Sequence, residues 1–205
     1  EYQARTLLDE LRGRPEVEIE LARWAVEAGD FGGAIEALIP VATRSSIPRA
    51  VRADAWSVIA VSRDLSGDGD GALVASEAAL DLDPKSAKPY ITLAGLAQGR
   101  GDLESALEHL RRAWGMDPAN VRLLLRIASV AEQAGKAADA ILALERAVEI
   151  EPGSARIASL LVELQVRTGR YSDAATTLSR ALDRHPTDPS LLRLADRLPR
   201  EIGIR

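Results

Sequence analysis

A 34-residue period constrains the fold of this sequence more than any other feature. Prolines recur at this spacing, each followed two residues later by a residue type that caps helix starts: Pro84 and Ser86, Pro118 and Asn120, Pro152 and Ser154, Pro186 and Asp188. Glycines recur at the same spacing, at Gly67, Gly101, Gly135 and Gly169. Glycine can adopt the left-handed conformation that ends one helix before the next begins. We therefore expect two helices of about a dozen residues between successive prolines.

Alanines within the expected helices keep the same period. They form two series: Ala72, Ala106, Ala140 and Ala174, and Ala79, Ala113, Ala147 and Ala181. Small residues seven positions apart make a flat stripe on which a neighbouring helix packs closely. We interpret these alanines as core, together with the large apolar residues Trp56, Tyr90 and Leu124. Because such a repeat cannot bury its apolar face alone, a final helix is expected to cover the last repeat.

This pattern resembles the tetratricopeptide repeat, W-x2-L-G-x2-Y…A-x3-F…P. One repeat, for example, supplies Tyr90, Leu93, Ala94, Gly101, Ala106, Leu110, Ala113 and Pro118. The aromatic residue of the family's tyrosine position is absent, and Arg63, Ala97, Ala131 and Gln165 stand there. The resemblance covers residues 15–186. It implies an all-α fold, a right-handed superhelical solenoid of antiparallel helix pairs with about twelve helices and no strands.

In this frame the chain is one solenoid domain of successive repeats. Residues 1–14 are expected to form the second helix of a truncated preceding repeat. The expected repeats are 15–46, which is divergent, then 47–84, 85–118, 119–152 and 153–186, with a covering helix and tail at 187–205. Pro48 predicts an early start, and hence a lengthened first helix, in the repeat 47–84. Because the sequence starts at Glu1, we interpret it as a piece of a longer protein.

Composition and motifs argue against several kinds of chemistry. There is no cysteine, which excludes disulfides, cysteine metal sites and a thiol nucleophile. The two histidines, His109 and His185, are 76 residues apart and fall on an outer helix and in an inter-repeat turn, so they do not converge. A net charge of −5 argues against nucleic acid binding, and no apolar run reaches the length of a membrane span. We therefore predict no enzyme activity, no cofactor and no metal site.

The resemblance implies a concave surface lined by the first helix of each repeat. In the early repeats the repeat phase places there Glu16, Glu20, Arg23, Asp54, Ser57, Val61 and Asp64. The candidate peptide-binding groove consists of Lys88, Thr92, Arg122, Arg126, Ser129, Arg156, Ser159, Glu163 and Arg193. Residues 1–102 carry a net charge of −6 and residues 103–205 a net charge of +1, so the groove runs from acidic to basic. Because arginine forks suit carboxylates, the expected ligand is an acidic or C-terminal peptide segment. The alternative is that these arginines form exposed ion pairs of little energetic value.

We thus predict a non-enzymatic scaffold or adaptor that binds a protein or peptide segment within a larger bacterial multi-protein assembly. No nucleic acid partner and no direct membrane insertion are expected, and self-association is left open. The alternative is a repeat arm of a larger enzyme, or of an exopolysaccharide or pilus secretion apparatus, whose active domain lies outside these residues. Arginine outnumbers lysine by 23 to 3, which is typical of GC-rich bacterial genomes, and both cytoplasm and periplasm fit as compartments.

Overall fold

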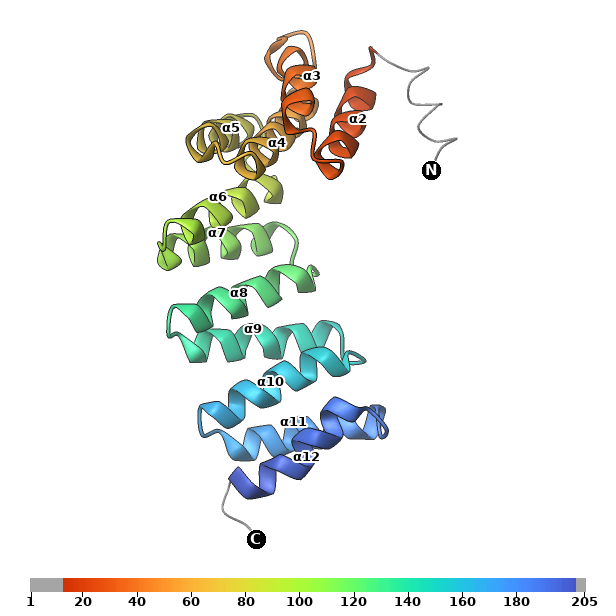
Figure 1. Cartoon of the computed structure of the whole chain (residues 1–205), viewed down its shortest axis with the longest axis vertical. Helices are drawn as coiled ribbons and strands as arrows, with labels where there is room; N and C mark the ends of the chain where they lie inside the picture. The colour runs from red at the N-terminus through yellow and green to blue at the C-terminus, as the bar shows by residue number, and fades with distance from the viewer. Residues whose placement is uncertain (1–12, 202–205) are drawn as a thin grey trace. The chain divides into compact units, whose positions relative to one another are not determined.

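Helices account for nearly all of the described backbone. The structure, a computed structural model, describes residues 13–201, and the side chains of residues 13–198. This range holds eleven helices and no strand: α2 (Pro15–Glu27), α3 (Phe31–Thr43), α4 (Arg49–Leu65), α5 (Gly69–Leu82), α6 (Ala87–Gly99), α7 (Leu103–Met116), α8 (Val121–Gln133), α9 (Ala137–Ile150), α10 (Ala155–Arg167), α11 (Tyr171–Arg184) and α12 (Pro189–Glu201) (Figure 1). The prediction of an all-α chain is confirmed. The helix expected at 1–14 lies, up to residue 12, outside the described residues.

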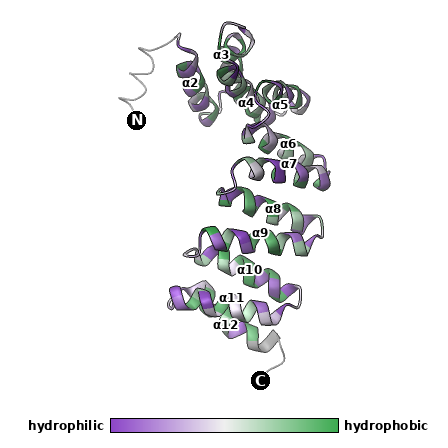
Figure 2. Cartoon of the chain, turned by 180° about the vertical axis from the view of Figure 1, so that it is seen from behind, coloured by the Kyte–Doolittle hydropathy of each residue, from purple (hydrophilic) through white to green (hydrophobic). Residues whose placement is uncertain are grey.

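The chain divides into two compact units, Glu1–Met116 and Asp117–Arg205. Short turns join a first helix to a second helix, so that antiparallel pairs form: α2 with α3, α4 with α5 and α6 with α7 in the first unit, and α8 with α9 and α10 with α11 in the second. The last helix, α12, packs against both α10 and α11. Each helix carries hydrophobic and hydrophilic residues (Figure 2). This is the helix-pair architecture that the period predicts. Within the described range, no helix is both long and apolar enough to cross a membrane.

Glycines in the left-handed conformation end the first helices, as predicted. Gly67, Gly101, Gly135 and Gly169 have φ values of 87°, 77°, 72° and 76°. At the end of α6 the backbone N–H of Gly101 donates to the carbonyl of Gln98 at 3.0 Å, and that of Asp102 to Ala97 at 2.9 Å. These two bonds satisfy carbonyls that the end of a helix leaves free, and they turn the chain into the next helix.

The predicted cap residues stand at helix starts, but one of them does not cap. Asn120 accepts a hydrogen bond from the backbone N–H of Leu123 at 3.3 Å, the third residue of α8, and Ser154 does the same for α10. Ser86 precedes α6 and makes no such bond. The third residue of α6 is Pro89, which has no N–H to donate. The Ser86 hydroxyl therefore lacks the backbone N–H that would usually donate to it.

The core is built from the alanine stripes and from aliphatic residues of both helices of each pair. All eight predicted alanines are buried, at most 6% exposed. In the first unit the fully buried Leu38 and Ile59 form one core cluster with other buried alanines, such as Ala55 and Ala60. In the second unit, Leu191, Leu194 and Leu198 of α12 close the core over α10 and α11. The longest helix is α4, with 17 residues against 13 in α6, because it begins directly after Pro48.

Candidate functional site

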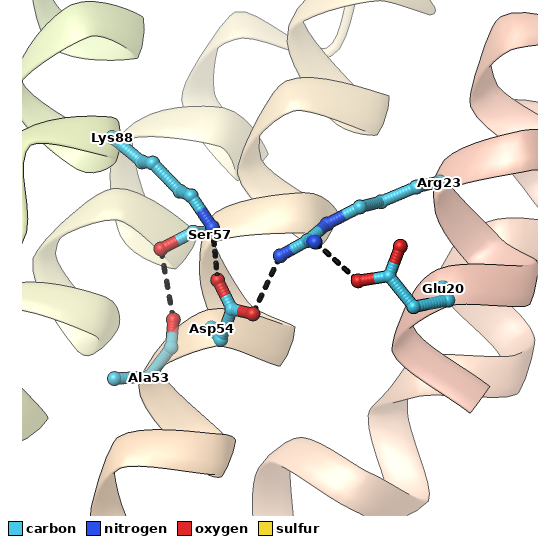
Figure 3. Close-up of polar contacts among 6 residues, drawn as sticks. All are labelled: Glu20, Arg23, Ala53, Asp54, Ser57 and Lys88. Atoms are coloured by element: carbon cyan, nitrogen blue, oxygen red, sulfur yellow. Dashed lines mark hydrogen bonds and ion pairs between the residues drawn. The ribbon is translucent and has the colours of Figure 1, made fainter. Parts of the chain in front are cut away.

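Among the first helices of the first unit, α4 packs against both α2 and α6, and the outward residues of these three helices are here called the first face. At its centre stands Asp54 of α4 (Figure 3). One oxygen of its carboxylate, Oδ2, accepts a hydrogen bond from Arg23 Nη2 of α2 at 2.5 Å. The other, Oδ1, accepts from Lys88 Nζ of α6 at 2.5 Å. Arg23 also donates to Glu20 Oε1 on its own helix. One carboxylate thus ties three successive repeats together.

This bridge orders side chains more than it stabilises the fold. The Asp54 and Arg23 side chains are 34% and 33% exposed and that of Lys88 is 53% exposed. Ion pairs with this exposure contribute about 0–1 kcal/mol each. The consequence for the face is electrostatic, because Asp54 and Glu20 together balance the charges of Arg23 and Lys88 and hold both cations in place.

Two hollows flank the bridge. The acidic hollow has a volume of about 530 Å³, and its lining includes Glu16, Glu20, Asp54, Asp83 and Lys88. The apolar hollow has a volume of about 330 Å³, and its lining includes Val26, Val58, Val61, Ile91 and Thr92. Both volumes fall in the range of ligand pockets, about 300–1,000 Å³. Ser57 also lines the apolar hollow, but its hydroxyl donates to the Ala53 carbonyl at 2.8 Å and so adds little polarity (Figure 3).

In the second unit the first helices are α8 and α10, with α12 following, and their outward residues are here called the second face. Arg122 of α8 and Arg156 of α10 are exposed, and neither has an ion-pair partner among the described side chains. Arg126 is half-buried and already engaged with another group. Arg167 of α10 donates to Glu132 of α8 at 2.6 Å, which links the C-terminal ends of these two helices.

The remaining predicted groove residues differ in exposure. Thr92 and Ser159 are buried, at 5% and 9% exposed, and Ser159 Oγ has no hydrogen-bond partner within the described residues. Ser129 is exposed and accepts from Gln133 Nε2 at 3.4 Å. Arg193 folds back on its own helix, where its Nε donates to the Pro189 carbonyl at 3.0 Å.

Glu163 is exposed and lines a small gap between α10 and α12. Of the predicted groove residues, Lys88 and Thr92 lie together in the apolar hollow of the first unit, and the other seven belong to the second unit.

The histidines lie on second helices or at their ends. His109 of α7 stacks on Tyr90 with 6.2 Å between the ring centroids, and Arg112 lies 5.9 Å from the centre of the Tyr90 ring. Burial lowers the pKa of His109, and its Nδ1 has no hydrogen-bond partner in the described part of the chain. His185 ends α11. Among the described residues no three His, Asp or Glu side chains gather as a metal site would require.

Two parts of these surfaces do not follow from the repeat phase. Asp83, which lines the acidic hollow, lies in the Asp-Pro step between repeats, where the helical phase assigns no face. A further hollow of about 440 Å³ lies between α9 and α11, and Gln165 forms part of its floor. Gln165 is buried, and its side-chain carbonyl has no hydrogen-bond partner among described residues. The signal was present in the sequence, because Gln165 occupies the position where the repeat pattern calls for an aromatic residue.

Comparison with known families and curated proteins gives one kind of match. Two family models described as tetratricopeptide repeat match residues 91–155 and 131–198. A search of curated proteins found no match.

Many solved structures share the fold. PilF of Pseudomonas aeruginosa is 20% identical over 93% of this chain and 85% of that chain, with a TM-score of 0.68. MamA from Desulfovibrio magneticus RS-1, residues 41 to the end, is 15% identical over 86% and 98%, with a TM-score of 0.63. YrrB, described as a tetratricopeptide repeat protein with an unusual peptide-binding site, is 16% identical over 94% and 97%, with a TM-score of 0.62. At these identities the similarity establishes the fold.

Proposed function

Because this chain belongs to the tetratricopeptide repeat family, we propose that it is a non-enzymatic scaffold that binds a protein or peptide segment on its first-helix faces. The two matched stretches together run from residue 91 to residue 198. The peptide-binding site described for YrrB, which has the same fold, supports a peptide ligand here. In this proposal the scaffold is one part of a larger bacterial multi-protein assembly.

The observation that carries the proposal is the pair of uncompensated arginines on the second face. Arg122 and Arg156 occupy the same position in successive repeats, 34 residues apart. Both are exposed, and no carboxylate among the described side chains pairs with either. Lys88 occupies this position in the preceding repeat, but it is already paired with Asp54. Free guanidinium groups favour carboxylate ligands, so the acidic segment is expected at the second unit.

A charge reversal on the second face tests this function. The probe is a fluorescein-labelled peptide of alternating glutamate and serine, and binding to the whole chain is followed by fluorescence anisotropy. Replacing both arginines, Arg122→Glu with Arg156→Glu, should raise the Kd about tenfold or more, because two attractive contacts become repulsive. Binding to the unaltered protein should also weaken as salt is added.

The matched control reverses the charge of two arginines that lie on a second helix. Arg180 and Arg184 of α11 are exposed, and the described side chains include no acidic partner for either. Arg180→Glu with Arg184→Glu makes the same change in net charge and should leave the Kd nearly unchanged. If both double variants lose the same amount of affinity, the effect comes from the net charge of the protein and not from the second face. Unchanged binding after the reversal on the second face would remove the proposal.

A further inference from the structure

The first face offers a ligand different chemistry from the second face. The lining of the acidic hollow contains four carboxylates and one ammonium group, from Glu16, Glu20, Asp54, Asp83 and Lys88. Glu20 and Asp54 are engaged with Arg23 and Lys88. Glu16 and Asp83 have no ion-pair partner among the described side chains. Two carboxylates therefore remain available to a cation that enters this hollow.

The apolar hollow begins on the other side of the bridge. Val26 of α2, Val58 and Val61 of α4, and Ile91 of α6 supply aliphatic surface from three successive first helices. Val26, Val61 and Ile91 are half-buried, so part of their apolar surface faces water. An aliphatic side chain that covers this surface gains the free energy of apolar burial.

The bridge between the hollows makes both usable by one ligand. Without Asp54, the cations Arg23 and Lys88 would repel a basic side chain that approached the acidic hollow. Asp54 contacts both cations at 2.5 Å, and Glu20 pairs with Arg23, so two negative charges face two positive ones. Glu20, Arg23, Asp54 and Lys88 together carry no net charge, so they do not repel a basic segment that lies across them.

The distance between the hollows fixes the spacing of the ligand's anchors. On α4 the acidic hollow is lined by residues from Ala50 to Asp54, and the apolar hollow by residues from Ser57 to Val61. At 1.5 Å per residue, the centres of these two stretches lie about 10 Å apart along the helix. An extended peptide covers this distance in about three residues.

We infer that the first face binds an extended segment of a partner protein in which a lysine or arginine and a large aliphatic residue stand about three positions apart. The cationic side chain enters the acidic hollow, and the aliphatic side chain fills the apolar hollow. This inference rests on the proposed scaffold function and adds a second ligand class, opposite in charge to the segment expected at the second face.

A peptide array tests both the charge and the spacing of the two anchors. Each probe is a serine-glycine peptide that carries one leucine and one lysine, in either order, separated by one to seven positions. A second set replaces lysine by glutamate. The labelled protein is the full chain with Arg122→Glu and Arg156→Glu, so that the second face does not attract the glutamate set. Its binding should peak at a separation of about three in the lysine set and should be absent from the glutamate set. Equal signals from both sets, or no dependence on spacing, would overturn the inference.

Two variants locate the binding on the first face. Glu16→Lys with Asp83→Lys should raise the Kd for the best leucine–lysine peptide about tenfold and should transfer binding to the corresponding glutamate peptide. Val61→Asp puts a charge in the apolar hollow and should raise the Kd for leucine-containing peptides by a similar factor, about tenfold. Far-UV circular dichroism checks that each variant keeps its helices. Full retention of lysine-dependent binding by both variants would also overturn the inference.

The second face supplies the control that separates this inference from the proposed function. Arg122→Glu with Arg156→Glu should leave the leucine–lysine peptides bound as before. If acidic peptides bind in an Arg122-dependent way but no leucine–lysine peptide binds, the inference fails and the scaffold function stands. If neither class of peptide binds, both fail.

Discussion

At the scale of single residues, Gly101 shows how backbone conformation alone can select an amino acid. It ends α6 with a φ of 77°, in the left-handed region. A Cβ built at this position meets no heavy atom within 4 Å. Because there is room for a side chain, the preference for glycine is conformational rather than steric.

Replacing this glycine should therefore cost stability, whereas the same replacement inside a helix should add it. Gly101→Ala is expected to lower the free energy of unfolding by about 1–2 kcal/mol, because a Cβ disfavours the left-handed conformation. Gly115 lies within α7, where a Cβ also meets nothing within 4 Å. Gly115→Ala should raise the free energy of unfolding by about 0.4–1 kcal/mol. Urea unfolding of both variants measures the difference, and equal shifts would refute the conformational explanation.

The sequence predicts such positions well when the cause is local. Spacing alone identifies the glycines at the ends of first helices, because the left-handed turn depends only on a few neighbouring residues. The same spacing predicts that Ser86 stands at the start of α6, which is confirmed, but the hydrogen bond expected from its hydroxyl is not formed. Pro89 removes the donor, an interaction that a series of cap residues does not reveal even though both residues are visible in the sequence.

At the scale of one element, α12 shows which leucines the core requires. Leu191 is fully buried against the second unit, while its neighbour Leu192 is 43% exposed. The repeat pattern predicts a covering helix here but does not distinguish the two leucines, because both are apolar. Which of them faces the core depends on how the helix is rotated about its axis, and this depends on the packing of α12 against α10 and α11.

Two adjacent leucine-to-alanine changes should therefore differ sharply. Leu191→Ala leaves a cavity and should lower the free energy of unfolding of the second unit by about 2–5 kcal/mol. Leu192→Ala removes an exposed side chain and should change it by less than about 0.5 kcal/mol. Urea unfolding followed by far-UV circular dichroism measures both. A large loss from Leu192→Ala would mean that α12 packs through a different side.

The sequence predicts which helices carry the residues of the candidate site, but it does not predict which of these side chains contact one another. The repeat phase places Arg23 and Asp54 among the lining residues of the first helices, yet their direct contact depends on the distance between successive repeats. That distance is altered locally, because Gly29 and Gly67 are 38 residues apart rather than 34. The same phase assigns Thr92 and Ser159 to the groove, but close packing around their helices buries both.

At the scale of the whole molecule, the two units differ in charge and in spectroscopic signal. The first unit, Glu1–Met116, has a net charge of −6 and the second, Asp117–Arg205, of +1. If the two binding preferences proposed above are both correct, one chain holds an acidic and a basic segment at once. All three tryptophans, Trp24, Trp56 and Trp114, belong to the first unit. Tryptophan fluorescence therefore reports unfolding of the first unit, whereas far-UV circular dichroism reports both.

This asymmetry allows the independence of the units to be measured in one experiment. In repeat proteins the free energy of unfolding is approximately the sum of the stability of each repeat and of the interfaces between neighbouring repeats. A destabilising substitution in a terminal repeat therefore affects the adjacent repeats first. Leu191→Ala should move the circular dichroism transition to lower urea while the fluorescence midpoint stays unchanged. The reciprocal variant, Leu110→Ala, removes a fully buried side chain of α7 and should move the fluorescence midpoint. If Leu191→Ala shifts the fluorescence midpoint as far as the circular dichroism midpoint, the chain unfolds as one cooperative body and the division into two units has no energetic meaning.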